Sequence, residues 1–226
     1  MRPEKENAPE RIGIYGGTFD PIHFGHLQVS TAICEAFALD RFLLVPAFIP
    51  PHKRGRQISA PHHRYTMAVL ATMQQPLIKV STIELEAPTR PFTIETLRTL
   101  QKLYPTSSLF FVMGGDSFAE VHLWREYEQL LTEFNIIVAD RPNSNSFTLQ
   151  HLSPLCRQRV VDLRASKRPD LSQGDEAHVF LTDYVSVDVS ATQVRSAIQN
   201  GLSIEALVPD EVASYIQKYE LYRNEN

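Results

Sequence analysis

The chain is poor in cysteine and has no long hydrophobic segment. Its only cysteines, Cys34 and Cys156, are not spaced as in a zinc or redox motif. We therefore expect thiols of a reducing compartment, and the cytoplasm is the expected location. No apolar run approaches the length of a membrane span, and the polar first residues contain no hydrophobic segment of a signal peptide. No membrane partner is expected.

Positive charge is not in excess either. The chain carries 22 Lys and Arg against 26 Asp and Glu, a formal net charge of -4, and its pI is about 6.1. Such a chain has no overall basic field that would attract nucleic acid. A small-molecule partner is the better expectation.

Several common catalytic signatures are missing from the sequence. It contains no GK[ST] Walker lysine, no HExxH, no GxSxG and no complete GxGxxG. These absences argue against P-loop and hydrolase mechanisms of the common types. A phosphate-binding function must therefore use other residues.

Apolar runs without alternation predict buried parallel strands, because both faces of such strands are covered. These runs lie at residues 12–15, 41–47, 77–87, 108–113, 135–142 and 178–182, and helical patterns lie at 26–39, 61–73, 93–104, 124–134, 190–200 and 210–222. The expected fold is a doubly wound, Rossmann-like parallel sheet with helices on both faces. Residues 1–10 are expected to be a flexible tail and residues 11–226 a single domain. Residues 143–177 look irregular, with a short helix near 157–163. The last helix is expected to bury Val212, Ile216 and Tyr219.

The stretch GGTFDPIHFGH, residues 16–26, follows the first strand. Gly16 and Gly17 have no Cβ, so their backbone can approach a ligand closely and can adopt a positive φ where the turn needs it. His23 and His26 are three residues apart at a helix start, where free N–H groups favour an anion. A structural turn with two surface histidines is the simpler alternative. The pair of imidazoles separated by Gly25 favours a functional site.

This stretch resembles the signature of the HxGH nucleotidyltransferases, and its GGTFDPIH form resembles the nicotinate-mononucleotide adenylyltransferase family. The resemblance implies catalysis by His23 and His26. It further implies an ATP site formed by Gly16, Gly17, Thr18, Phe19, His23, His26, Gly114, Asp116, Arg141, Ser190, Thr192 and Arg195. It also places Lys53, in a basic loop after two prolines, on a phosphate, although a solvated loop explains Lys53 equally well.

Two further positions are assigned to the pyridine ring by the same resemblance. Thr93 is also well explained as the cap of the helix that it begins, and Trp124 is equally well explained by core packing. Asp116 follows a second strand that ends in two glycines. It either caps the next segment or accepts hydrogen bonds from ribose hydroxyls, and we favour the ribose.

The stretch VSATQVRSAIQNG, residues 189–201, resembles the family motif ISSTxxR. Ser190 and Gln193 form a capping-box pattern and Gly201 ends the helix. A free helix N-terminus with hydroxyls and Arg195 makes a phosphate pocket.

Together these motifs suit adenylyl transfer from ATP to nicotinate mononucleotide, giving deamido-NAD and pyrophosphate. Mg2+ is expected to be bound mainly by ATP phosphates and water, with no metal site on the protein, because no carboxylate cage is evident. A sibling enzyme such as a pantetheine-phosphate adenylyltransferase, or a non-catalytic nucleotide sensor, stays open as an alternative. The sequence leaves the oligomeric state open, including a homo-oligomer.

Overall fold

A computed structural model describes residues 9–48, 58–140, 148–164, 168–171 and 176–223. Its strands form one parallel sheet in the order β3-β2-β1-β4-β5-β7-β6. They are β1 (Arg11–Gly17), β2 (Arg41–Pro46), β3 (Ile78–Val80), β4 (Ser108–Gly114), β5 (Asn135–Ala139), β6 (Val160–Asp162) and β7 (Val179–Thr182).

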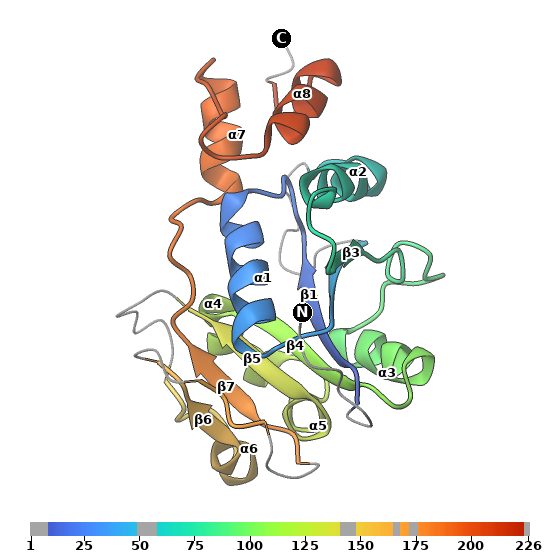
Figure 1. Cartoon of the computed structure of the whole chain (residues 1–226), viewed down its shortest axis with the longest axis vertical. Helices are drawn as coiled ribbons and strands as arrows, with labels where there is room; N and C mark the ends of the chain where they lie inside the picture. Colours follow the sequence, from blue (N-terminus) through green and yellow to red (C-terminus); the bar gives the residue numbers. More distant parts are fainter. Residues whose placement is uncertain (1–8, 49–57, 141–147, 165–167, 172–175, 224–226) are drawn as a thin grey trace.

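Helices cover both faces of the sheet (Figure 1). One face is covered by α1 (Phe24–Ala36) and α2 (Pro61–Thr72), and α7 (Ala191–Gln199) and α8 (Asp210–Lys218) extend the same hydrophobic cluster beyond the end of the sheet. The other face packs against α3 (Thr93–Leu103), α4 (Gly115–Ala119), the 3-10 helix η1 (Val121–Leu123), α5 (Tyr127–Glu133) and α6 (Pro154–Gln158). The predicted doubly wound fold is confirmed.

Successive side chains along a strand point alternately into two hydrophobic clusters, one on each face of the sheet. In β2, Phe42 and Leu44 belong to the cluster under α1, whereas Leu43 and Val45 belong to the cluster under α3. All four side chains are buried, so the strand must be apolar at every position, as the sequence pattern indicated. Gly13 on β1 leaves room for the Phe42 ring, whose nearest atom would lie 2.5 Å from an added Cβ.

The strand predicted at 77–87 and the helix predicted at 157–163 were wrong in extent. The strand predicted at residues 77–87 is only β3, because after Val80 the Ser81 and Thr82 oxygens accept turn hydrogen bonds from Ile83 N–H and Glu86 N–H. The helix predicted at 157–163 is α6, which starts earlier because Ser153 caps it and Pro154 is its first residue. The residues after it form β6 instead.

Two residues near the ends of the described chain, Glu10 and Tyr219, differ from the sequence predictions. Glu10 was placed in the flexible tail, but its carboxylate lies 3.0 Å from the Arg41 guanidinium and its carbonyl accepts from Ser108 N–H. It therefore belongs to the fold. Tyr219 was predicted to be buried with Val212 and Ile216, but it follows α8 and is 49% exposed.

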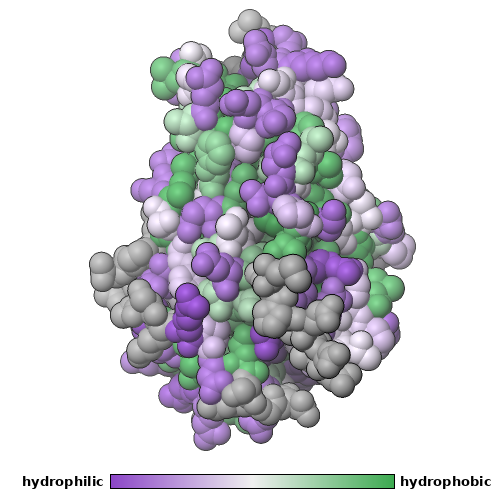
Figure 2. Space-filling model, in the orientation of Figure 1, coloured by the Kyte–Doolittle hydropathy of each residue, from purple (hydrophilic) through white to green (hydrophobic). Residues whose placement is uncertain are grey.

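The helices drawn towards the viewer in Figure 1 form a mixed surface. Hydrophilic and hydrophobic residues are interspersed over the face drawn in Figure 2. No helix of the described segments is long and apolar enough to span a membrane.

Candidate active site

The order of the strands reverses between β1 and β4. From β1 the chain adds β2 and β3 on one side, whereas β4 pairs with the other side of β1. At such a point the following segments leave towards opposite faces, and a crevice opens at the carboxyl ends of the strands. β1 ends at Gly17 and β4 at Gly114, so the two glycine-rich strand ends are neighbours.

His23 and His26 lie together at the start of α1. His23 is the N-cap residue, and its backbone N–H donates to Nδ1 of His26 over 3.2 Å. The ring centroids are 3.7 Å apart with an interplanar angle of 31°. The prediction that both imidazoles lie on one side of the helix start is confirmed. Because Nδ1 of His26 accepts a hydrogen bond, its ring proton is on Nε2, which is then a donor.

Gly25 is required by the packing around this pair. An added Cβ would lie 3.1 Å from the His23 ring and 3.1 Å from the carbonyl oxygen of Val189. A side chain at this position would therefore crowd the histidine pair, which explains the glycine between them. The second contact also shows that the residue before Ser190 reaches the start of α1, so the two motifs meet.

Burial changes the acid–base behaviour of His23. Its side chain is 7% exposed, and its Nδ1 is buried with no hydrogen-bond partner among the described residues. Desolvation lowers the pKa of His23 from 6.5 to about 4. At neutral pH the free protein therefore holds His23 as a neutral imidazole.

The helix N-terminus is partly used within the protein. The Phe24 N–H donates to the Leu207 carbonyl over 3.0 Å, so it is not open to an anion, contrary to the expectation that the first-turn groups are free. The stretch before α7 is held here too, because the Gln28 side chain bonds Tyr184 O and Ser186 N.

The glycines at the end of β1 serve a purpose that the sequence did not reveal. Gly16 and Gly17 are in the strand, and the residue with a positive φ is Phe19, at 49°. The Phe19 ring covers Gly17, where an added Cβ would lie 2.9 Å from it, and Phe19 is 1% exposed. Its side chain therefore packs in the core beside His26, at 5.0 Å between ring centroids.

Arg195 lies next to the loop that leads to His23. Its Nη1 donates to the Asp20 carbonyl over 2.6 Å and its Nη2 to the Thr192 hydroxyl over 3.2 Å. Ser190 caps α7 by accepting from Gln193 N–H, and Gly201 follows the helix with φ of 67°. The predicted N-cap, Ser190, and the predicted helix stop, Gly201, are both confirmed. The Ser190 hydroxyl oxygen is already engaged in the cap.

Asp116 lies over the end of β4. It is exposed, and its Oδ1 accepts from Ser117 N–H over 2.8 Å. An added Cβ on Gly114 would lie 2.6 Å from that oxygen, so the glycine makes room for the carboxylate. Burial, with a smaller contribution from the Asp116 charge, raises the pKa of the Tyr15 hydroxyl to about 12.

Arg64 is a functional candidate that the sequence analysis did not single out. This α2 residue is 1% exposed, and its guanidinium donates to the carbonyls of Thr18 (2.8 Å), Phe48 (3.1 Å) and Ser59 (3.0 Å). It therefore fixes Thr18, a predicted ATP-binding residue. A signal existed, because Arg64 shares the apolar stripe of α2 with Met67 and Ala68, where a charge is unexpected.

Thr93 is the first residue of α3 rather than its cap. Phe92 occupies the N-cap position, and its N–H donates to the Glu95 carboxylate over 2.8 Å. Thr93 therefore contributes one of the first-turn N–H groups that have no partner within a helix. This arrangement still presents a helix N-terminus to a ligand.

Trp124 precedes α5 rather than opening it, because Glu126 has φ of 52° and the helix starts at Tyr127. The Trp124 ring packs against the core near Phe111, while its Nε1 is buried without a partner among the described residues. Trp124 therefore packs in the core and also carries an indole N–H donor that has no partner among the described residues.

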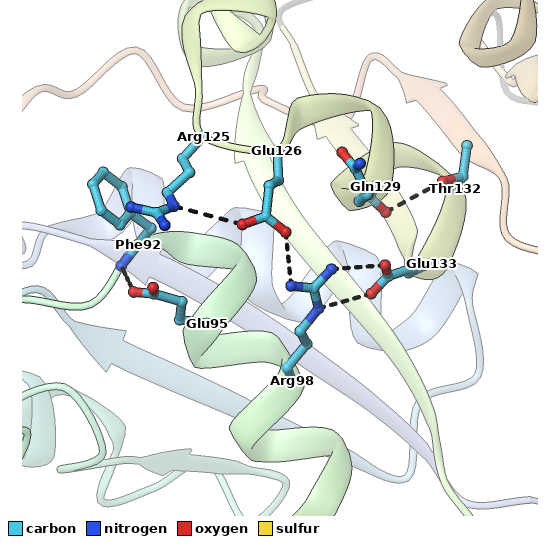
Figure 3. Close-up of polar contacts among 8 residues, drawn as sticks. All are labelled: Phe92, Glu95, Arg98, Arg125, Glu126, Gln129, Thr132 and Glu133. Carbon is cyan, nitrogen blue, oxygen red and sulfur yellow. Dashed lines mark hydrogen bonds and ion pairs between the residues drawn. The ribbon is translucent and has the colours of Figure 1, made fainter.

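A charged clamp joins the Trp124 segment to α3 (Figure 3). Arg98 contacts Glu126 over 2.8 Å and holds Glu133 through two bonds, over 2.8 and 3.0 Å. The guanidinium of Arg125 lies 4.8 Å from the centre of the Phe92 ring. These contacts tie the residues that flank Trp124 to the residue before Thr93.

Two predicted site residues, Lys53 and Arg141, lie outside the described residues.

Comparisons with known proteins agree with this geometry. A family described as cytidylyltransferase-like matches residues 14–197. A probable nicotinate-nucleotide adenylyltransferase of Desulfitobacterium hafniense (strain Y51) is 36% identical over 95% of this chain and 97% of its own length. One from Citrifermentans bemidjiense is 37% identical over 94% of this chain and 98% of its own.

Solved structures show the same fold. The nicotinic acid mononucleotide adenylyltransferase of Plasmodium falciparum, complexed with NaAD, superposes with a TM-score of 0.67 at 21% identity and covers 94% of this chain and 97% of its own. From the curated relatives, which match along nearly their whole length, the chain belongs to the nicotinate-nucleotide adenylyltransferase family of cytidylyltransferase-like proteins.

Proposed function

We propose that the protein transfers the adenylyl group of ATP to nicotinate mononucleotide, giving deamido-NAD and pyrophosphate. The observation that carries this proposal is the stacked pair His23 and His26 at the carboxyl end of β1, beside Arg195. Two imidazoles and a guanidinium at a helix start suit the charges of a triphosphate.

The reaction needs no covalent enzyme intermediate. An oxygen of the mononucleotide 5′-phosphate attacks the α-phosphorus of ATP in line, and the bond from that phosphorus to the oxygen bridging to the β-phosphate breaks. Pyrophosphate leaves with that bonding pair. The enzyme contributes position and charge stabilisation.

We assign the histidines different shares of this work. His26 presents Nε2–H as a donor to a phosphate oxygen on which charge grows, because its Nδ1 is held by the His23 N–H. His23 is neutral in the free protein. The negative charge of ATP would raise its pKa and favour a second donor at the same place.

Arg195 and the start of α7 hold the polyphosphate in this proposal. A guanidinium has five N–H donors, so its bonds to Asp20 O and Thr192 leave donors for phosphate oxygens. Ser190 and Thr192 add hydroxyls. The glycines of β1 and β4, the Thr18 and Phe19 backbone and Asp116 form the nucleoside side, and Lys53 and Arg141 stay predictions.

Magnesium enters as the partner of ATP. Within the described segments, no three His, Cys, Asp or Glu side chains form a group that could hold a metal ion. We place the ion on phosphate oxygens and water, which is a common arrangement for Mg2+. Bound there, it would neutralise charge on the polyphosphate.

The pyridine ring is assigned to Thr93 and Trp124. The first turn of α3 offers N–H groups to a carboxylate, and Trp124 offers a ring and an indole N–H. The clamp of Figure 3 holds these two sides together. We place the reaction in the cytoplasm, in keeping with two buried thiols.

Release of pyrophosphate tests the proposal. Purified protein with ATP and Mg2+ is given nicotinate mononucleotide, nicotinamide mononucleotide or phosphopantetheine in separate reactions. We expect fastest release with nicotinate mononucleotide. Release only with phosphopantetheine would identify the sibling enzyme, and nucleotide binding without release from any acceptor would identify a sensor.

A further inference from the structure

The end of the chain returns to the loop that carries His23. Tyr222, four residues after α8 ends, donates its hydroxyl to Oδ1 of Asp20 over 2.7 Å. Its neighbour Leu221 packs against the core cluster under α1, and its N–H donates to the Ile216 carbonyl over 3.1 Å. Figure 1 shows α8 beside α2, at the same end of the molecule as the start of α1.

Asp20 is the junction of three segments. Its side chain is 2% exposed and accepts from both the Tyr222 hydroxyl and the Ser59 N–H, the latter over 3.3 Å. Its carbonyl accepts from Arg195 over 2.6 Å. Asp20 lies three residues before His23, so the segments before α2, in α7 and after α8 all hold the backbone that leads into the histidine pair.

The Tyr222 hydroxyl is suited to this task because it remains a donor. Burial, reinforced by the nearby Asp20 charge, strongly raises its pKa. A hydrogen bond in such a site is stronger than one in water, and losing it leaves a buried carboxylate oxygen with one partner fewer.

We propose that Tyr222 is a positioning residue for adenylyl transfer, which acts through Asp20 on the backbone that carries His23 and His26. It touches no reacting atom in this scheme. The inference rests on the proposed function. It extends the active site to the last residues of the described chain, which none of the sequence motifs indicated.

The test compares Tyr222→Phe with Tyr219→Phe, a matched loss of one hydroxyl three residues earlier, on an exposed ring. Both variants are assayed with ATP and nicotinate mononucleotide, and melting temperatures are recorded. A misplacement of about 1 Å at a reacting group can cost about 10²-fold in rate. We expect kcat of Tyr222→Phe to fall roughly 10- to 100-fold, with KM for ATP nearly unchanged and Tyr219→Phe at the wild-type rate.

A purely structural role gives a different pattern. If Tyr222→Phe melts at a lower temperature but keeps the wild-type kcat well below melting, the proposal is overturned. Wild-type protein that transfers nothing would overturn the proposed function instead, so the two failures are distinguishable.

Asp20→Ala removes the acceptor and serves as the second variant if Tyr222→Phe does not fold. Its kcat should fall at least as far as that expected for Tyr222→Phe, with the same small change in KM for ATP. Where both fold, the double variant should lose little more than Asp20→Ala alone, because the two residues act as a unit. Full additivity, or an Asp20→Ala rate equal to wild type, would refute the link.

Discussion

At the scale of single residues, His23 combines constraints that seldom occur together. It occupies the N-cap position of α1, stacks on His26 and is 7% exposed. A charged imidazole would have to be desolvated at this position, so the folded protein favours the neutral form of His23. Its protonation is therefore coupled to folding.

His23 predicts that stability is lost on acidification. Its folded pKa, about 4, is below the ordinary histidine pKa of 6.5. Its contribution is therefore fully present above pH 6.5 and is lost as the pH falls from 6.5 towards 4. At about 1.4 kcal/mol per pH unit this amounts to roughly 3 kcal/mol.

Urea unfolding at pH 7, 6, 5 and 4 measures this dependence. His23→Asn, which keeps a side chain that can cap a helix, removes the titrating group. The difference in free energy of unfolding between wild type and variant should shrink as the pH falls, or reverse so that the variant is the more stable protein. Parallel curves for the two proteins would contradict the assignment.

His26 predicts a kinetic effect instead. Its Nε2–H is proposed to stabilise charge that develops in the transition state, and removing one such donor typically costs about 10² to 10³ in kcat. His26→Ala should therefore lose rate far more than ATP affinity. His178→Ala, a histidine next to β7 that contacts Asn135 and Phe180, is the control. Near-normal kcat in His26→Ala would refute the role.

At the scale of elements, the clamp between α3 and the start of α5 predicts a selective effect on the mononucleotide. Arg98→Met removes the guanidinium that joins Glu126 and Glu133. The relative position of Thr93 and Trp124 should loosen, and KM for nicotinate mononucleotide should rise roughly 2- to 30-fold. KM for ATP should stay close to wild type.

Steady-state kinetics with each substrate varied in turn distinguish these effects. Lys102→Met removes a cation from the same helix without breaking the clamp. An Arg98→Met enzyme in which both KM values rise equally would show that the clamp supports the whole fold and not the pyridine side.

The same elements predict a preference for the acid over the amide. First-turn N–H groups of α3 can donate to both oxygens of a carboxylate, and the helix dipole adds attraction. An amide would turn its NH2 towards a donor, and one unsatisfied buried donor costs roughly 1 to 3 kcal/mol, or about 5- to 150-fold. We expect kcat/KM to favour nicotinate mononucleotide by that factor. Equal values for the two mononucleotides would overturn the assignment and leave adenylyl transfer intact.

The sequence predicted those elements whose signals are local. Runs such as Phe42–Val45 gave the buried strands, and Ser190 with Gln193 gave the start of α7, because strand burial and capping depend on near neighbours. β6 was missed and β3 was predicted too long, since a three-residue strand is fixed by its partner and not by its own pattern.

The site divides in the same way. The pairing of His23 with His26 and the role of Gly25 follow from their spacing. The contacts of Arg64, Tyr222 and Arg98 could not be predicted, because each joins segments that are remote in sequence. The burial of Phe19 could not be predicted either, because it depends on the packing around Gly17.

At the scale of the whole molecule, the site is assembled from parts far apart in the chain. Residues 16–26, 114–116 and 190–195 come together only in the folded protein. A nucleotide that contacts all three binds the native state and not the unfolded chain. Ligand binding should therefore stabilise the entire fold.

A non-hydrolysable ATP analogue should raise the melting temperature accordingly. At 100 times Kd the gain is about 2.7 kcal/mol, which corresponds to roughly 5–11 °C for a domain of this size. Arg195→Ala should show a smaller shift than wild type at the same concentration of analogue, because the phosphates lose a guanidinium. Arg157→Ala, an exposed cation on α6, should show the wild-type shift.

Each shift is taken relative to the same variant without ligand, so that loss of the Arg195 bond to Asp20 does not enter the comparison. Equal shifts for wild type and Arg195→Ala would remove Arg195 from the phosphate site, whereas no shift for any protein would contradict a nucleotide site built from these three segments.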